Sequence, residues 1–314
     1  MPQNPIQFQQ GMSLNEFMTR YGTEEQCEAA LERARWPGGF VCAQCGAHRH
    51  GAFAVGRRRY WECAHCHAQT TLRSGTLFHA SKLPLIVWFQ AIYRVTQNKN
   101  NLSALSLKPH LGICDRSAWR LKHKLMEAMA EREAPPGGWT APTSAASAPA
   151  SPGAVLRTRC RLSPPSSSTR RGHPQRVRLD PIPDLKAASV RAWARGALAP
   201  SAHLVTDGPS SFAAAGEEVA QYGAIIVSPR KSSARSPFRW VNTFISNAKT
   251  AIRGTCHHFD FAKYRRRYLA QAQYRINRRF DLASLVGRLI WASARTAPCP
   301  ERWLRLAEVR GNWE

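Results

Sequence analysis

Four of the nine cysteines form two close pairs that could hold one metal ion. The pairs are Cys42-x2-Cys45 and Cys63-x2-Cys66, and 17 residues separate them. This spacing is typical of two tight turns that each direct two thiolates at one point. We predict a structural Zn²⁺ site with four sulfur ligands, which leaves no open coordination position for catalysis. Alternative nitrogen ligands nearby are His48, His50, His65 and His67.

A strand-like basic run lies between the two cysteine pairs. It contains Arg57, Arg58 and Arg59, and the aromatic residues Tyr60 and Trp61 follow directly. Arginines can contact phosphates and the aromatic rings add surface for stacking, so the run is a candidate nucleic-acid contact. The alternative is an exposed basic hairpin that binds nothing.

A second basic group follows Gly112. It consists of Arg116, Arg120, Lys122 and Lys124. These side chains would lie on or beside one face of a helix, while Ala118, Leu121 and Leu125 pack inward. With residues 102–111 as the preceding helix and Gly112 in the turn, the pattern predicts a helix-turn-helix that presents its second helix to a groove of DNA. A helical hairpin with a purely structural role is the alternative.

The overall charge also favours a nucleic-acid partner. Lys and Arg number 45 against 20 Asp and Glu, which gives a formal charge of +25 and a pI near 10.7. The basic residues are spread through patterned segments that also contain apolar residues, whereas a membrane-surface anchor would concentrate them in one tail. Because the chain has no signal peptide and no run of about 18 apolar residues, we expect a cytoplasmic, nucleoid-associated protein. A basic surface without a binding role is the alternative.

The elements that would position these residues divide into four predicted segments. Residues 13–79 combine a helical lead-in with the zinc ribbon, whose short strands are expected near 53–55, 59–62 and 70–72. Residues 80–133 contain predicted helices at 83–96, 102–111 and 115–132. Residues 134–175 have low complexity, and no Asp or Glu occurs between Ala134 and Leu179, which predicts disorder.

The fourth segment, residues 176–310, alternates predicted strands and helices. The strands are expected at 176–179, 203–206 and 224–227, and the helices at 185–198, 238–253 and 261–280. Such alternation is typical of a layered α/β domain. The fold class is therefore α+β and multidomain.

Together these motifs resemble the zinc-ribbon class of insertion-sequence transposases. The resemblance rests on the cysteine ribbon, the helix-turn-helix and three phrases, which are TLRSGTLF from Thr71, VTDG from Val205 and GTCHHF from Gly254. It covers about residues 13–133 and 175–310. The resemblance implies an RNase H-like domain of the DDE type, in which carboxylates hold two divalent ions for cleavage and joining of DNA.

The resemblance also implies a set of catalytic residues. Asp207, after the strand at 203–206, corresponds to the second metal-binding Asp of the family. Asn242 falls where the third acidic residue is expected, and Asn is a variant in this group. Lys249 lies seven positions further on, on the same helical face, where it could meet a phosphate. The implied catalytic cofactor is Mg²⁺ or Mn²⁺.

The first Asp of the family has no counterpart in this sequence. The acid-free segment occupies its place, and Asp180 and Asp184 are poor substitutes because both flank the Pro181-x-Pro183 turn. We hypothesise two compensating reading-frame slips. If the DNA that encodes residues 139–149 is read in the frame that starts at the third base of each codon, the Trp139 codon and the next two bases give an Asp codon. The codons that follow can then encode Gly-Ala-Tyr-Leu-Gly-Gly. An Ala, Pro and Ser-rich stretch is also expected to supply no central strands.

These observations predict a transposase that binds double-stranded DNA at terminal inverted repeats and at the target, as a homo-oligomer and without a membrane. Catalysis is expected to be impaired because the first Asp is absent. One rival interpretation is a non-enzymatic zinc-ribbon regulator that binds DNA. Another is an RNA-binding ribbon protein of the translation apparatus, which the basic charge also permits.

Overall fold

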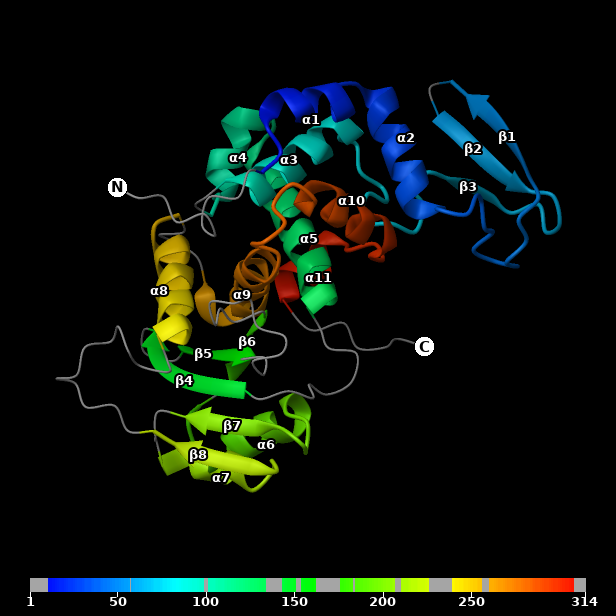
Figure 1. The fold of residues 1–314 in the computed structure, drawn as a ribbon. Helices are drawn as coiled ribbons and strands as arrows, with labels where there is room; N and C mark the ends of the chain where they lie inside the picture. The colour runs from blue at the N-terminus through cyan, green and yellow to red at the C-terminus, as the bar shows by residue number, and fades with distance from the viewer. Residues whose placement is uncertain are drawn as a thin grey trace. The chain divides into compact units, whose positions relative to one another are not determined.

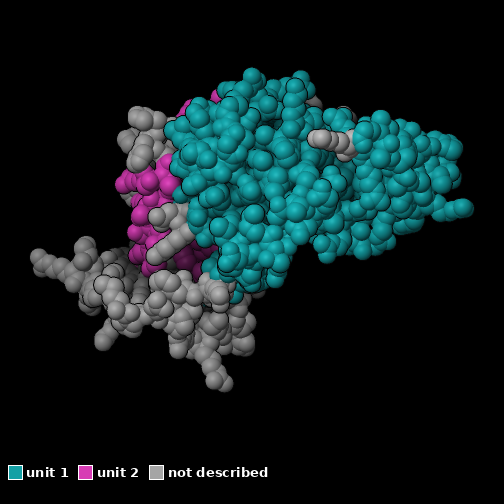
Figure 2. Space-filling view, turned by 90° about the horizontal axis from the view of Figure 1, so that it is seen from above, with its two compact units in different colours: residues 1–131, 280–314 teal, residues 132–279 magenta. Residues whose placement is uncertain are grey.

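The computed structural model of the chain forms two compact units, which are coloured separately in Figure 2. Unit 1 comprises Met1–Glu131 and Phe280–Glu314, and unit 2 comprises Arg132–Arg279. The structure describes residues 11–56, 58–98, 101–133, 143–150, 154–161, 176–182, 184–206, 210–225, 239–255 and 260–307. None of the helices within these ranges is long and apolar enough to cross a bilayer.

Unit 1 begins with two short capped helices, α1 (Leu14–Tyr21) and α2 (Glu24–Arg35). Each starts with a capping box, Ser13 with Glu16 and Thr23 with Gln26, which satisfies amides that the first turn leaves unpaired. These helices confirm the predicted helical lead-in.

A three-stranded antiparallel sheet follows, with the order β1-β2-β3 (Figure 1). The strands are β1 (His50–Val55), β2 (Arg58–Cys63) and β3 (Gln69–Thr71). Trp61 of β2 is buried and lies 5.2 Å from Trp36, ring centre to ring centre. The guanidinium of Arg35 donates to the carbonyls of Thr71 and Leu72 at 2.6 and 2.8 Å, which ties the end of α2 to β3.

Three further helices occupy the positions that the periodicity predicts: α3 (Leu85–Gln97), α4 (Ala104–Leu111) and α5 (Asp115–Glu133). Gly112 ends α4 in the left-handed region, with φ of 61°, where glycine meets no Cβ penalty. Residues 104–133 therefore form two helices joined by a tight turn.

The C-terminal helices α10 (Leu285–Arg295) and α11 (Glu301–Leu306) belong to unit 1. Helix α10 packs on α2 and α3, and the carbonyl of Ser293 accepts a hydrogen bond from the amide of Leu77 at 3.1 Å. The division therefore differs from the predicted segment 176–310, because residues 280–307 pack with the N-terminal helices. Packing between distant segments leaves no sign in the local pattern.

Unit 2 contains a five-stranded sheet with the order β6-β5-β4-β7-β8 (Figure 1). The strands are β4 (Thr143–Ala150), β5 (Ala154–Arg161), β6 (Arg176–Ile182), β7 (His203–Thr206) and β8 (Gln221–Ala224). Neighbours among β4, β5 and β6 are antiparallel, whereas β4, β7 and β8 run parallel.

Two of these strands correct the sequence prediction. Residues 134–175 were expected to be disordered and to supply no central strand, yet β4 is the central strand and β5 lies beside it. The physical reason is that β4 forms ladders with neighbours on both sides, and this non-local pairing does not require an alternating pattern within the strand itself. The rest of residues 134–175 lies outside the described residues.

Helices cover the sheet of unit 2: α6 (Ala187–Ala197), α7 (Ala213–Gly216), α8 (Arg239–Arg253) and α9 (Phe261–Asn277), with a single 3₁₀ turn at Ser210–Phe212. Val190 of α6 packs with Leu204 of β7 and Phe212 in a buried apolar cluster. Helix α8 lies against β4 and β5, and α9 lies against β6.

Side-chain amides of α9 pair with the backbone of the edge strand β6. Asn277 accepts from the amide of Val177 at 2.6 Å and donates to its carbonyl at 2.9 Å, and Gln273 accepts from the amide of Leu179 at 2.8 Å. The buried carboxylate of Glu133 accepts from both amide side chains, at 2.9 and 2.6 Å, and from Arg278. These bonds satisfy backbone groups that an edge strand would otherwise expose.

Candidate functional site

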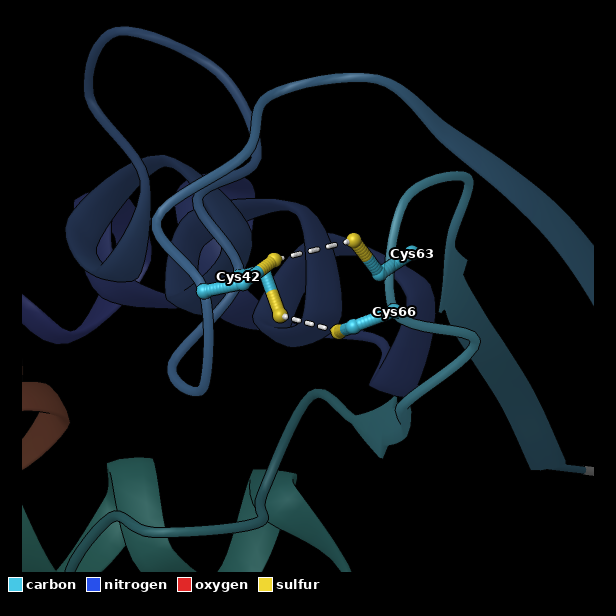
Figure 3. Close-up of side chains that lie close together, drawn as sticks. Cys42, Cys63 and Cys66 are labelled. Carbon is cyan, nitrogen blue, oxygen red and sulfur yellow. Dashed lines mark hydrogen bonds between the residues drawn. The ribbon is translucent and has the colours of Figure 1, made fainter.

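The four predicted cysteines converge in unit 1. Their sulfur atoms all lie within 4.8 Å of one another. Figure 3 shows the two pairs facing each other, with Sγ–Sγ separations of 3.6 Å for Cys42 and Cys66 and 3.5 Å for Cys45 and Cys63. A tetrahedral ion with Zn–S bonds of about 2.3 Å places its sulfurs about 3.8 Å apart. The cluster therefore fits Zn²⁺ with four thiolate ligands.

Backbone amides prepare two of these sulfurs to carry negative charge. The amides of Cys45 and Gln44 lower the pKa of Cys42 to about 6, and the amides of Cys66 and His65 lower the pKa of Cys63. The amide of His65 lies 3.4 Å from the sulfur of Cys63. The other two sulfurs, of Cys45 and Cys66, have raised pKa values, with hydrogen bonds from neighbouring cysteine sulfurs among the causes. One cysteine of each pair is thus prepared as the thiolate that binds zinc.

The histidines near the cluster are engaged elsewhere. Nδ1 of His48 lies 3.2 Å from the carbonyl of Phe40, and Nδ1 of His50 lies 3.1 Å from the carbonyl of His48. His67 lies 3.6 Å from a carboxylate oxygen of Glu62. The metal-binding group thus consists of sulfur alone, as the spacing predicts.

The basic run between the pairs lies at the tip of the β1–β2 hairpin. Arg58 and Arg59 are exposed on β2, whereas Arg57 lies outside the described residues. The guanidinium of Arg59 is 3.5 Å from the carboxylate of Glu32 and 4.9 Å from the ring centre of Trp61. On the opposite face of the hairpin, Phe53 and Tyr60 stack with an interplanar angle of 11°. Cations and aromatic rings are therefore both accessible here.

Helix α5 presents only part of its predicted basic group to solvent. The side chains of Arg116 and Arg120 are 70% and 42% exposed, whereas Lys122 and Lys124 are 1% and 7% exposed as whole residues. The ammonium of Lys124 donates to the carbonyl of Leu77 at 3.1 Å. The placement of Lys122 and Lys124 on a DNA-facing surface is thus corrected, because every residue of α5 from 121 to 130 is buried.

The candidate catalytic residues are only partly described. Strand β7 ends at Thr206, and Asp207 lies outside the described residues, as do the histidines of the GTCHHF phrase. Asn242 is exposed on α8, and Lys249, two turns further on, is half-buried. The predicted helix that carries Asn242 and Lys249 is therefore present.

The strand beside β7 carries no carboxylate. Ala145 of β4 pairs with Thr206, and residues 143–150 contain no acidic residue. Asp180 lies on β6, which β5 and β4 separate from β7, or about 14 Å at strand spacings of about 4.8 Å. It accepts from Arg178 at 2.8 Å and from the indole of Trp193 at 2.9 Å, a structural role.

Comparison with known proteins gives two family matches. Residues 22–69 match the family model described as the transposase zinc-ribbon domain, and residues 156–277 match that of the ISXO2-like transposase domain. A curated relative, an uncharacterized protein in transposable element ISH50 of Halobacterium salinarum, is 26% identical over 110 residues. This alignment covers 34% of the chain and 36% of the relative, so the chain spans well under two thirds of that relative's length. No solved structure matches the chain.

Proposed function

Because the chain matches a transposase zinc-ribbon domain and an ISXO2-like transposase domain, we propose that it is an insertion-sequence transposase that binds element-end DNA as an oligomer. The pair of domain matches, with a four-sulfur cluster inside the first, is the observation that carries this proposal. The exposed arginines of the β1–β2 hairpin and of α5 would contact phosphates of the duplex. Arg35 at the end of α2 is hydrogen-bonded to β3 of the ribbon sheet. The arginines of the hairpin and those of α5 therefore belong to the same compact unit.

Unit 2 would be the catalytic domain, with an RNase H-like fold. Its support is the sheet, in which three antiparallel strands continue into two strands parallel to the central one. Asp207 follows the last residue of β7 in sequence, and Asn242 and Lys249 lie on a helix that packs on the central strands. A divalent ion held by Asp207 and Asn242 would activate an oxygen for attack on a phosphodiester. Lys249 would neutralise a phosphate.

We further propose that strand transfer is impaired. The resemblance places the first metal-binding Asp on a strand soon after the helix-turn-helix, and β4, the first described strand after α5, offers only Thr, Ser, Ala and Pro. Asn242 is neutral and binds Mg²⁺ more weakly than a carboxylate would. This acid-free strand also favours the second candidate function, a DNA-binding regulator without catalysis.

Three measurements on purified protein test the proposal. Metal analysis should give stoichiometric zinc, and duplex DNA from the element ends should be bound in preference to structured RNA and to a scrambled duplex. A plasmid excision assay should give little or no product. Abundant excision would overturn the claim of impairment, and equal binding of structured RNA would favour the RNA-binding alternative.

The regulator and the impaired transposase differ at Asp207. Asp207→Ala should abolish any residual Mg²⁺-dependent nicking of element-end DNA while DNA binding persists. If the wild-type protein shows no nicking in Mg²⁺ or Mn²⁺ at all, the regulator is the better description.

A further inference from the structure

One carboxylate in unit 1 gathers three arginines. Glu301, the first residue of α11, contacts Arg116 and Arg120 of α5 and Arg305 of its own helix. The Arg116 guanidinium binds both carboxylate oxygens, at 2.8 to 3.2 Å, and Nε of Arg305 donates at 2.9 Å. Nε of Arg120 lies 3.4 Å away. We call these four residues the Glu301 cluster.

The exposure of the side chains differs sharply within the Glu301 cluster. The carboxylate side chain of Glu301 is 14% exposed, whereas Arg116 and Arg305 are 70% and 60% exposed. The carboxylate is therefore the covered part of the cluster, and the guanidinium groups of Arg116 and Arg305 are its exposed part. A ligand that approaches from solvent meets cations first.

The charges of the cluster do not cancel. Three guanidinium groups surround a single carboxylate, and the Arg116 hydrogen bonds hold the pKa of Glu301 below its usual value, so this group is ionised at neutral pH. Counted over these four residues alone, two positive charges remain in excess. The ring of Trp119 lies 5.1 Å from the Arg305 guanidinium carbon, which further restricts that side chain.

We propose that Arg116, Arg120 and Arg305 form a clamp for a phosphate group of duplex DNA, with Glu301 as the positioning residue. This inference rests on the proposed DNA-binding function and adds α11 to the DNA-binding surface. Arginine forks match phosphate geometry, and a fork already held by Glu301 loses less freedom when it binds. In the opposite role, Glu301 occupies the arginine donors and competes with phosphate, so removal of its carboxylate would strengthen DNA binding.

Arg305 offers the sharpest test, because Arg302 is a matched control. Arg302 carries the same charge on the same helix, but its guanidinium lies over Trp303. Binding of a fluorescein-labelled duplex is measured by anisotropy at several salt concentrations. Arg305→Ala should weaken binding about tenfold and reduce the salt slope by about 1, while Arg302→Ala changes affinity by less than about twofold. Arg305→Lys should recover part of the loss.

Glu301→Ala decides between positioning and shielding, with Glu25→Ala as a control of equal charge change at an exposed site. Positioning predicts weaker binding for Glu301→Ala than for Glu25→Ala, with melting curves recorded to confirm folded protein. Tighter binding for Glu301→Ala, or equal losses for Arg305→Ala and Arg302→Ala, would overturn the proposal. A wild-type protein that does not bind duplex DNA would instead overturn the proposed function, and the clamp with it.

Discussion

At the scale of single residues, the cysteine cluster combines suitable sulfur separations with backbone amides that lower the pKa of Cys42 and Cys63. Cys42→Ser should therefore remove bound zinc and lower the melting temperature, because a structural zinc ion contributes directly to folding free energy. Metal analysis and differential scanning calorimetry measure both effects. Cys114→Ser, which removes an exposed thiol outside the cluster, serves as the control and should retain zinc. Full zinc content in Cys42→Ser would contradict the assignment of ligands.

Two other cysteines should differ in reactivity. Burial raises the pKa of Cys27 to about 12, and nearby carboxylates add to this effect. The hydroxyl and amide of Ser117 lower the pKa of Cys114, which is exposed at the start of α5. Since the thiolate is the nucleophile, iodoacetamide should label Cys114 more than about tenfold faster than Cys27 in the zinc-loaded protein. Peptide mass spectrometry measures both rates, and labelling of Cys27 at a comparable rate would show that α2 opens readily.

The residues that sequence identifies best are those whose partners are close in the chain. The spacing of the four cysteines predicts their cluster, and the family matches confirm the resemblance to insertion-sequence transposases. The sequence pattern predicts Lys124 on the surface of its helix, yet the side chain is buried and its ammonium donates to the carbonyl of Leu77. Glu301 has no local signal, because 185 residues separate it from Arg116.

At the scale of elements, Glu24 connects three parts of unit 1. Its carboxylate accepts from the amides of Leu85 and Ile86 at 2.7 and 2.9 Å, at the start of α3, and from Arg73 at 2.9 Å. Glu24→Gln should lower the free energy of unfolding by about 1 to 3 kcal/mol, because charge-assisted bonds to the first turn of α3 are weakened. Urea denaturation measures this.

Glu25 provides the matched control for Glu24, since it is the next residue on the same helix and is exposed. Glu25→Gln should change the free energy of unfolding by less than about 0.5 kcal/mol. Equal effects of the two substitutions would mean that the cap on α3 contributes little.

Elements with strong periodicity were predicted closely, and those fixed by distant pairing were not. The expected helices at 102–111 and 115–132 correspond to Ala104–Leu111 and Asp115–Glu133. Strand β4, in contrast, has a composition that disfavours strands, and its place in the sheet is defined by β5 and β7. Sheet pairing is a property of several segments together, so one segment cannot reveal it.

At the scale of the whole molecule, the formal charge of +25 should make DNA binding strongly dependent on salt. If Arg58 and Arg59 each neutralise one phosphate and the Glu301 cluster neutralises a third, log K should fall with log salt with a slope of about −2.7. Anisotropy titrations between low and physiological salt give this slope. A slope near zero would exclude phosphate contacts as the main source of affinity.

Unit 1 is made of two chain segments, and the sequence of unit 2 lies between them, which has a consequence for synthesis. Helix α10 is synthesised only after about 280 residues of the chain have been translated. The apolar face of α2 and α3 that packs on α10 therefore stays uncovered until translation is almost finished. A single uncompensated frame slip upstream would replace α10 and leave that face open to proteases.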